Sequence, residues 1–219
     1  GGVSPRPFDT LNTSFSTGDQ EKGVRANLKI IARALGAERL AFMNQVHGTD
    51  ICVLRSPLSE EPVRADAVIT DLRGVAIMVK QADCQAVILY DPVKEILANI
   101  HCGWRGNVHD FLAVVLDRME AEFGTQPSDV QAAIGPSLGP CCAEFVTHAQ
   151  LFPQSLGRFM VRKNYFDLWE ISRWQLASAG LRKEHIETSG ICTRCRTDLF
   201  FSYRAEKVTG RFATVAMLR

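Results

Sequence analysis

The sequence has almost no excess charge, no long apolar run and little in its first residues that resembles a signal peptide. The formal net charge is +1 over 219 residues, which argues against a strongly basic nucleic-acid binder and a polybasic membrane binder. No apolar stretch approaches the roughly 18 residues that a membrane-spanning helix needs. The segment Gly1–Pro5 has no apolar core of a signal peptide. We therefore expect a cytoplasmic protein that binds neither nucleic acid nor membrane.

The cysteine count excludes a fully paired disulfide framework. Seven cysteines cannot all pair internally, and a secreted disulfide scaffold is usually much shorter than this chain. We expect thiols that are buried, metal-bound or reactive in a reducing compartment. The hydrophobic share of 46% is ordinary for a globular protein, and the length allows a sizeable core. Since no repeat, linker or composition shift marks a boundary, we expect residues 1–219 to form a single domain.

Helical and strand patterns mix along the chain. Asp19 is a predicted N-cap, apolar residues at helical spacing follow as far as Leu35, and Gly36 is a predicted stop. Further helices are predicted at 111–119 and 169–181. Short β-branched runs predict buried strands of a mixed sheet at 67–70, 75–79, 86–90, 96–100, 130–134 and 212–218. The fold class is thus predicted to be α/β or α+β.

Three residues that could carry chemistry stand near the ends of predicted elements, namely His47, Cys84 and His101. Cys84 opens one apolar strand and His101 closes the next, so antiparallel pairing would bring a thiolate and an imidazole together. Two imidazoles and one thiolate suit zinc with an open fourth position, where bound water can become a hydroxide nucleophile. One alternative is a buried cysteine with two hydrogen-bonded histidines. Another is a thiol hydrolase with Cys84 as nucleophile and His101 as base.

Two charged residues adjoin these candidates. Gly103 and Gly106 allow a tight turn that presents Arg105, which could bind a phosphate or a carboxylate through two parallel hydrogen bonds. The alternative is a surface salt bridge. Asp83 precedes Cys84 and could shuttle a proton, or it could cap a turn.

A second group of cysteines lies in the C-terminal half. Cys192 and Cys195 form a Cys-x-x-Cys motif, and Cys141 and Cys142 are adjacent. Together they could form a second zinc site or a redox pair. No strand and helix flank Cys192 as in thioredoxin-type proteins, and we expect structural packing rather than a four-cysteine zinc site.

Five motifs occur in an order that resembles a known family. They are Asn44–Gly48, Ala82–Cys84, His101–Gly106, Ile134–Cys142, and Cys192–Cys195 with Phe200–Arg204. Over nearly its whole length the chain resembles the multicopper polyphenol oxidoreductase (laccase) family, also called the peptidoglycan editing factor family, which includes purine nucleoside phosphorylases.

The resemblance implies a set of site residues and a fold. The family's metal ligands correspond to His47, Cys84 and His101. Asn12 and Gln45 are expected to read the purine or the ribose. The implied fold is a single domain of mixed β-sheets in an αββα layered arrangement that resembles cysteine-hydrolase-like toxins. The family's first strand is expected to be missing here.

The resemblance also implies a chemistry. It implies zinc-dependent phosphorolysis of adenosine, inosine and methylthioadenosine, and deamination of adenosine, with purine nucleosides and phosphate as small-molecule partners. Copper would also bind these ligands, and copper-dependent polyphenol oxidation is a further expected activity. Five histidines are too few for a true multicopper centre. A non-enzymatic role in peptidoglycan editing is the remaining alternative, and the protein is expected to be a monomer or a homodimer.

Overall fold

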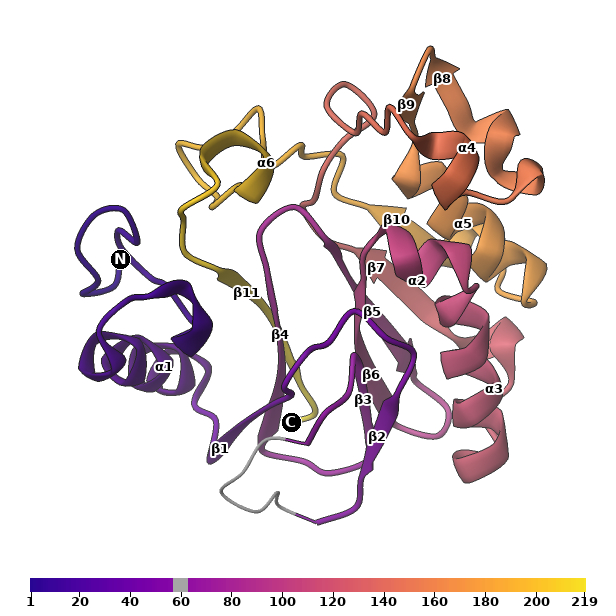
Figure 1. Cartoon of the computed structure of the whole chain (residues 1–219). Coiled ribbons are helices and arrows are strands. Elements are labelled where there is room, and N and C mark those ends of the chain that lie inside the picture. The colour runs from indigo at the N-terminus through magenta and orange to yellow at the C-terminus, as the bar shows by residue number, and fades with distance from the viewer. Residues whose placement is uncertain (57–62) are drawn as a thin grey trace.

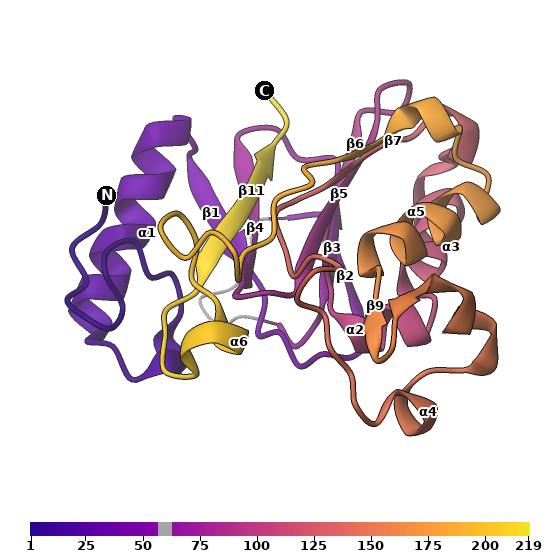
Figure 2. The same cartoon turned by 90° about the horizontal axis from the view of Figure 1, so that it is seen from above.

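The structure has four layers in the order helix, sheet, sheet, helix. It is a computed structural model that describes residues 1–56 and 63–219. Helix α1 (Glu21–Leu35) covers the outer face of a three-stranded sheet, while α3 (Phe111–Phe123) and α5 (Leu168–Ser178) cover the outer face of a six-stranded sheet (Figures 1 and 2). The predicted mixed α/β class and the αββα layering are therefore confirmed.

The small sheet has the strand order β1-β4-β11. Its strands are β1 (Arg39–Phe42), β4 (Val75–Gln81) and β11 (Phe212–Met217). Strand β4 pairs in parallel with β1 and antiparallel with β11.

The large sheet has the strand order β10-β7-β5-β6-β3-β2. Its strands are β2 (Ile51–Leu54), β3 (Ala67–Thr70), β5 (Gln85–Asp91), β6 (Ile96–Cys102), β7 (Gln131–Ile134) and β10 (Ile186–Thr188). The central strands β5 and β6 pair antiparallel over their full lengths. All the strands predicted from β-branched runs are present.

Short elements complete the chain. They are the helices α2 (Trp104–Val108), α4 (His148–Leu151) and α6 (Tyr203–Glu206), the hairpin of β8 (Met160–Arg162) and β9 (Tyr165–Phe166), and 3-10 turns at Phe15–Thr17, Pro127–Asp129, Gln154–Phe159 and Lys183–His185. Helix α2 directly follows β6 and α6 precedes β11, so both stand at the end of the sheets where β4 runs into β5, the upper end in Figure 1.

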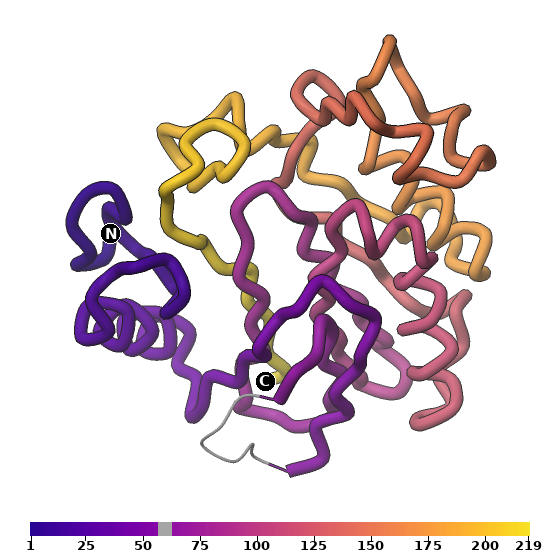
Figure 3. The backbone as a smooth tube through the Cα atoms, viewed as in Figure 1, coloured from indigo at the N-terminus to yellow at the C-terminus, as the bar shows by residue number. Residues whose placement is uncertain are grey.

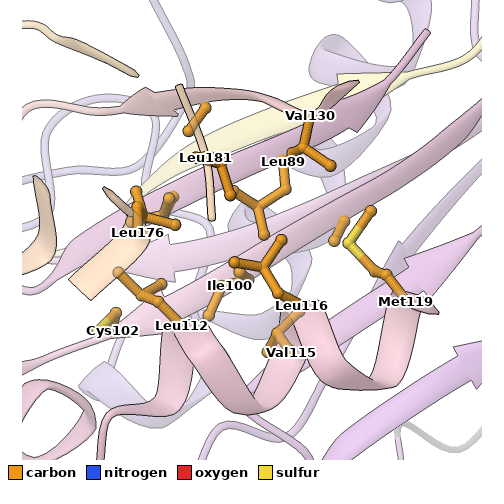
Figure 4. Close-up of a cluster of buried hydrophobic side chains, with 14 of the residues drawn as sticks. Leu89, Ile100, Cys102, Leu112, Val115, Leu116, Met119, Val130, Leu176 and Leu181 are labelled. Carbon is orange, nitrogen blue, oxygen red and sulfur yellow. The ribbon is translucent and has the colours of Figure 1, made fainter. Parts of the chain in front are cut away.

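The core explains why β5 and β6 read as continuous apolar runs. Leu89 and Ile100 from these strands pack against Leu112 and Leu116 of α3 (Figure 4). A second cluster, which includes Ile77 of β4, fills the space between the two sheets. Because the large sheet is covered on both faces, its strands need not alternate apolar and polar residues.

Two predicted helix ends are corrected by the structure. The N-cap of α1 is Gln20, and the Asp19 carboxylate instead accepts hydrogen bonds from the Gln20 N–H and from the side chain of Asn12. Helix α5 ends at Ser178, and the predicted end at 181 is wrong because Gly180 adopts a φ of 101° that breaks the helix. Gly36 does end α1, with a φ of 63°.

The N-terminal loop lies beside the segment that leads into β11 (Figure 3). The Arg211 N–H donates to the side chain of Asn12, and the Thr13 N–H donates to the Arg211 carbonyl. In residues 1–56 and 63–219, every helix is too short or too polar to cross a bilayer.

Candidate active site

The antiparallel pairing of β5 and β6 builds the centre of the site. Ala86 lies opposite His101 in the register, so Cys84, which ends the turn before β5, lies next to the end of β6. His47 comes from the loop between β1 and β2. The expectation that Cys84 and His101 meet across neighbouring antiparallel strands is confirmed.

The three side chains form a compact donor set. The Cys84 Sγ lies 4.0 Å from the His47 Nε2, and the rings of His47 and His101 are edge to face with centroids 4.7 Å apart. One donor atom from each residue lies within 4.8 Å of the other two. Zinc bonds of about 2.0–2.3 Å in a tetrahedron require donors roughly 3.3–3.8 Å apart, so small side-chain adjustments suffice. The residues therefore fit a metal ion.

The backbone at Gly103, directly after β6, passes close to the donor atoms without crowding them. A Cβ at Gly103 would lie 3.0 Å from the Cys84 Sγ and 3.9 Å from the His47 Cδ2. The contact with the Cys84 Sγ would be tighter than nearly all real Cβ contacts, and glycine therefore lets the chain after β6 pass against the thiol.

Asp66 is a functional residue that the sequence prediction missed. Its carboxylate is buried and accepts hydrogen bonds from the N–H groups of Val46, His47 and Gly48 at 2.8–3.1 Å. It also contacts the His101 Nδ1 at 2.8 Å, which leaves the His101 Nε2 for a ligand. Three successive amides aimed at one anion form a nest, and the left-handed φ of 59° at His47 produces it. One carboxylate thus holds both histidines.

The only available sequence signal for Asp66 is an acidic residue directly before the apolar strand β3. Strand β3 pairs with β6, and this pairing places Asp66 beside His101. A carboxylate–histidine–metal relay is the usual arrangement that fixes the orientation and tautomer of a ligating imidazole.

Electrostatics favour a thiolate next to a protonated imidazole. Burial opposes ionisation of Cys84, but the charge of His101 and hydrogen bonds from both histidines outweigh it and lower the pKa of the thiol to about 6. Burial likewise disfavours charge on His101, yet the Cys84 thiolate and the hydrogen bond to Asp66 raise the pKa of the imidazole to about 9. The pKa of Asp66 is lowered, because hydrogen bonds from His101 and the amide nest outweigh its burial.

The donor set lies at the junction of two cavities. The first has a volume of about 440 Å³, and its polar wall includes Ser14, Ser16, Asn44, Lys80 and Arg211. The second has a volume of about 350 Å³ and is lined by aromatic, aliphatic and cationic groups, among them Trp104, Arg105, Leu138, Phe145 and Arg204. His47, Cys84 and Tyr203 line both cavities. A molecule with two chemically different parts can therefore span the metal-binding residues.

Arg105 lies where an anion can reach it. It stands in the first turn of α2, is exposed and lines the second cavity. Its guanidinium packs 5.3 Å from the Trp104 ring centroid. Within residues 1–56 and 63–219 it has no hydrogen-bond or salt-bridge partner, so its donors face solvent and the cavity.

Asp83 is held by three donors. The hydroxyls of Thr193 and Ser202 both donate to its Oδ1 at 2.7 Å, and the Arg204 N–H donates to its Oδ2 at 2.6 Å. Its backbone has a φ of 88°, in the left-handed region. These contacts fit the turn-capping alternative, in which Asp83 fixes the turn that presents Cys84. The Oδ2 atom accepts only one of the three hydrogen bonds and Asp83 lines the second cavity, so the proton shuttle stays a prediction.

The two predicted substrate contacts differ in exposure. Gln45 lines the first cavity, and its carboxamide makes two hydrogen bonds to the backbone of Lys80. Asn12 is completely buried behind the wall of the first cavity, where its side chain forms hydrogen bonds with Ser14 and with the Arg211 N–H. Asn12 is therefore placed to position Ser14 and Arg211 rather than to touch a ligand.

The four cysteines of the C-terminal half also converge. The sulfur atoms of Cys141, Cys142, Cys192 and Cys195 all lie within 4.8 Å of one another, outside both cavities. All seven cysteines of the chain are free thiols.

Comparison with known proteins finds relatives that match most of the chain. A protein from Streptomyces coelicolor named purine nucleoside phosphorylase is 35% identical, over 97% of this chain and 90% of the relative. The Bacillus subtilis protein named purine nucleoside phosphorylase YlmD is 30% identical, over 96% of this chain and 83% of the relative.

Solved structures share the fold. The Bacillus licheniformis hypothetical protein YfiH superposes with a TM-score of 0.91 at 29% identity, over all of this chain and 90% of that one. YlmD from Geobacillus stearothermophilus gives a TM-score of 0.89 at 29% identity, over all of this chain and 89% of that one. The model of the family described as multi-copper polyphenol oxidoreductase laccase matches residues 1–219. The chain therefore belongs to the multi-copper polyphenol oxidoreductase laccase family.

Proposed function

We propose that the protein is a zinc-dependent purine nucleoside phosphorylase. The observation that carries the proposal is the donor set of His47, Cys84 and His101 at the junction of a polar and a cationic, partly aromatic cavity. Phosphorolysis needs a nucleoside and a phosphate that meet at one carbon atom, and two cavities with a shared floor suit two such reactants. The names of the relatives support the same reaction class.

The first cavity suits the nucleoside. The hydroxyls of Ser14, Ser16 and Tyr203 can bond to ribose hydroxyls or to purine nitrogens. Each carboxamide atom of Gln45 has one contact to Lys80 and keeps further capacity, so Gln45 can also read the purine or the ribose. Asn12 acts through Ser14 and Arg211 as a positioning residue.

The second cavity suits phosphate. Arg105 offers a planar guanidinium without a competing partner among the described residues, and Arg204 adds a second positive charge to the same wall. When zinc is bound, it supplies a Lewis acid at the floor between the cavities. Copper suits the same donors, so copper-dependent oxidation of polyphenols is a further activity to test. Deamination of adenosine, with water in place of phosphate, is another.

A product assay tests the reaction class. Adenosine, inosine and methylthioadenosine are incubated with the protein, with and without phosphate, while free base, sugar phosphate and ammonia are quantified. We expect release of base and sugar phosphate only when phosphate is present, and none from His47→Ala. Ammonia from adenosine would report deamination. If none of the three nucleosides is cleaved by protein with a full metal site, the proposal is wrong.

The contact between His101 and Asp66 favours a thiol hydrolase as a second candidate function. Cys84, His101 and Asp66 are arranged as nucleophile, base and orienting carboxylate, and the lowered pKa of Cys84 suits a thiolate nucleophile. The two candidates differ in the reactivity of Cys84. A ligand is shielded by the metal, whereas a nucleophile is alkylated rapidly in metal-replete protein and forms a covalent adduct with its substrate.

A further inference from the structure

The four-cysteine cluster joins two loops that are 50 residues apart in the sequence. Cys141 and Cys142 lie in the loop after β7, and Cys192 and Cys195 lie in the loop after β10. The Cys195 Sγ is 3.6 Å from the Cys141 Sγ and 3.5 Å from the Cys142 Sγ. Tetrahedral zinc with bonds of about 2.3 Å places its sulfur ligands about 3.8 Å apart. The spacing of the thiols therefore matches a closed four-sulfur zinc site.

Packing alone does not explain this cluster. Cys142 and Cys192 are buried, but Cys141 and Cys195 are exposed, so half of the sulfur atoms fill no core space. The Gly139 N–H donates to the Cys192 Sγ at 3.3 Å. Backbone donors on sulfur stabilise a thiolate, which is the form that binds metal.

The backbone holds the two loops in register. Ser137 and Cys192 form a parallel β-bridge, and the Thr193 N–H donates to the Ser137 carbonyl. A Cβ at Gly139 would lie 2.8 Å from the Trp169 ring and 3.0 Å from the Cys192 Cβ. Glycine is thus needed where the first loop passes against the second.

We propose that Cys141, Cys142, Cys192 and Cys195 bind a structural zinc ion that fixes one wall of the second cavity. This site is separate from the donor set of His47, Cys84 and His101, and it does not depend on which substrate the protein takes. All four positions are filled by protein sulfur, so the ion would stabilise the fold and leave no position for substrate.

The contacts of Thr193 connect this site to the reaction centre. Thr193 lies between Cys192 and Cys195, and its hydroxyl donates to the Asp83 carboxylate at 2.7 Å. The Leu138 N–H, from the other loop, donates to the Asp83 carbonyl at 2.8 Å. Both loops therefore hold the turn that presents Cys84. A bound ion would lock both loops at once.

Metal analysis of variants tests the proposal without an activity readout. The double variant His47→Ala/Cys84→Ser removes two donors of the reaction centre. Purified under reducing conditions without added metal, it should retain about one equivalent of zinc per chain. Adding Cys141→Ser and Cys195→Ser, both at exposed positions, should abolish this zinc, whereas adding Cys52→Ser on β2 should not. Loss of the retained zinc from the double variant itself, or its persistence after the two added serines, would overturn the proposal.

Thiol labelling tests the same point with the four cysteines intact, in case the serine variants do not fold. In the double variant, Cys141 and Cys195 should be labelled slowly by iodoacetamide, and at least tenfold faster after chelation, as read by peptide mass spectrometry. Cys52, with no metal contact, should not change. Rapid labelling of both exposed thiols before chelation, or a disulfide among the four, contradicts a zinc site.

Discussion

Replacing Asp66 by asparagine should loosen the reaction centre while leaving its donor atoms in place. Each carboxylate oxygen has two hydrogen-bond partners. The Oδ2 atom accepts from the N–H groups of Val46 and Gly48, and the Oδ1 atom contacts the His47 N–H and the His101 Nδ1. An asparagine NH₂ cannot accept a hydrogen bond, so either orientation of the amide loses two of these four contacts.

The expected magnitude follows from the burial of Asp66. Its relative exposure is 1%, so solvent cannot replace the lost contacts. Hydrogen bonds to a charged group contribute about 1.5–3 kcal/mol each, and two such losses cost at least about 3 kcal/mol. For a chain of this size that corresponds to a fall in Tm of about 6–12 °C. Loss of the partner that orients His101 should also weaken metal binding by about 10–100-fold.

Thermal unfolding and chelator competition measure both effects. Asp50→Asn is the matched control, because it removes one exposed carboxylate from the loop between β1 and β2 that carries His47. The control should keep the Tm and the metal affinity of the natural sequence. If Asp66→Asn binds metal as tightly as Asp50→Asn, with the same Tm, then Asp66 does not organise the centre and the reasoning is refuted.

Four further results are expected. Arg105→Lys should reduce phosphorolysis about tenfold and deamination much less, because lysine cannot form a planar bidentate pair with phosphate; equal losses in rate assays would remove the phosphate role. Burial lowers the pKa of Lys80 to about 8, so the side chain loses its positive charge as the pH rises through 8. The KM for nucleoside should rise over the same pH range, and a KM that stays unchanged up to pH 10 would contradict a contact between the Lys80 ammonium and the nucleoside. Gly103→Ala should weaken metal binding about tenfold because the added Cβ crowds the sulfur of Cys84, whereas Gly157→Ala, with open space around its Cβ, should leave metal binding unchanged. Equal metal affinities of the two variants in chelator competition would exclude a clash with Cys84. In metal-free protein, alkylation of Cys84 should reach half its maximal rate near pH 6, where its lowered pKa creates the thiolate, and a midpoint near pH 9 would show an ordinary thiol.

Sequence reasoning reached the strands and the donor set because both depend on local pattern. The β-branched runs at 86–90 and 96–100 predicted β5 and β6, and Cys84 and His101 were expected to meet if these strands were antiparallel neighbours. The structure has this pairing, which brings the two residues together at one end of the pair. The αββα layering came from family resemblance, since no local pattern shows which sheet covers which.

Contacts made by non-local pairing could not be predicted. Asp66 reaches His101 only because β3 pairs with β6, and its amide nest depends on the positive φ of His47. Asp83 and Asn12 looked like reactive or ligand-binding groups beside motifs. Asp83 accepts hydrogen bonds from Thr193 and Ser202, and Asn12 accepts one from Arg211. These partners lie more than 100 residues away in the sequence, so no local pattern could indicate the positioning contacts.

The convergence of the four cysteines depends on the same kind of long-range placement. The parallel bridge between Ser137 and Cys192 brings the two loops together. The sequence favoured a packing role of the four cysteines over a zinc site, because nothing local indicates that Cys141 and Cys195 stay exposed while all four sulfur atoms converge.

Metal add-back during turnover tests the central claim most directly. Protein treated with chelator, until elemental analysis finds less than about a tenth of an equivalent of metal per chain, is mixed with inosine and phosphate. Zinc is then added in steps. Phosphorolysis should be absent at the start and should return as zinc binds, while His47→Ala should remain inactive at the same zinc concentrations. If the metal-free protein cleaves inosine at the full rate, His47, Cys84 and His101 do not form a catalytic metal centre.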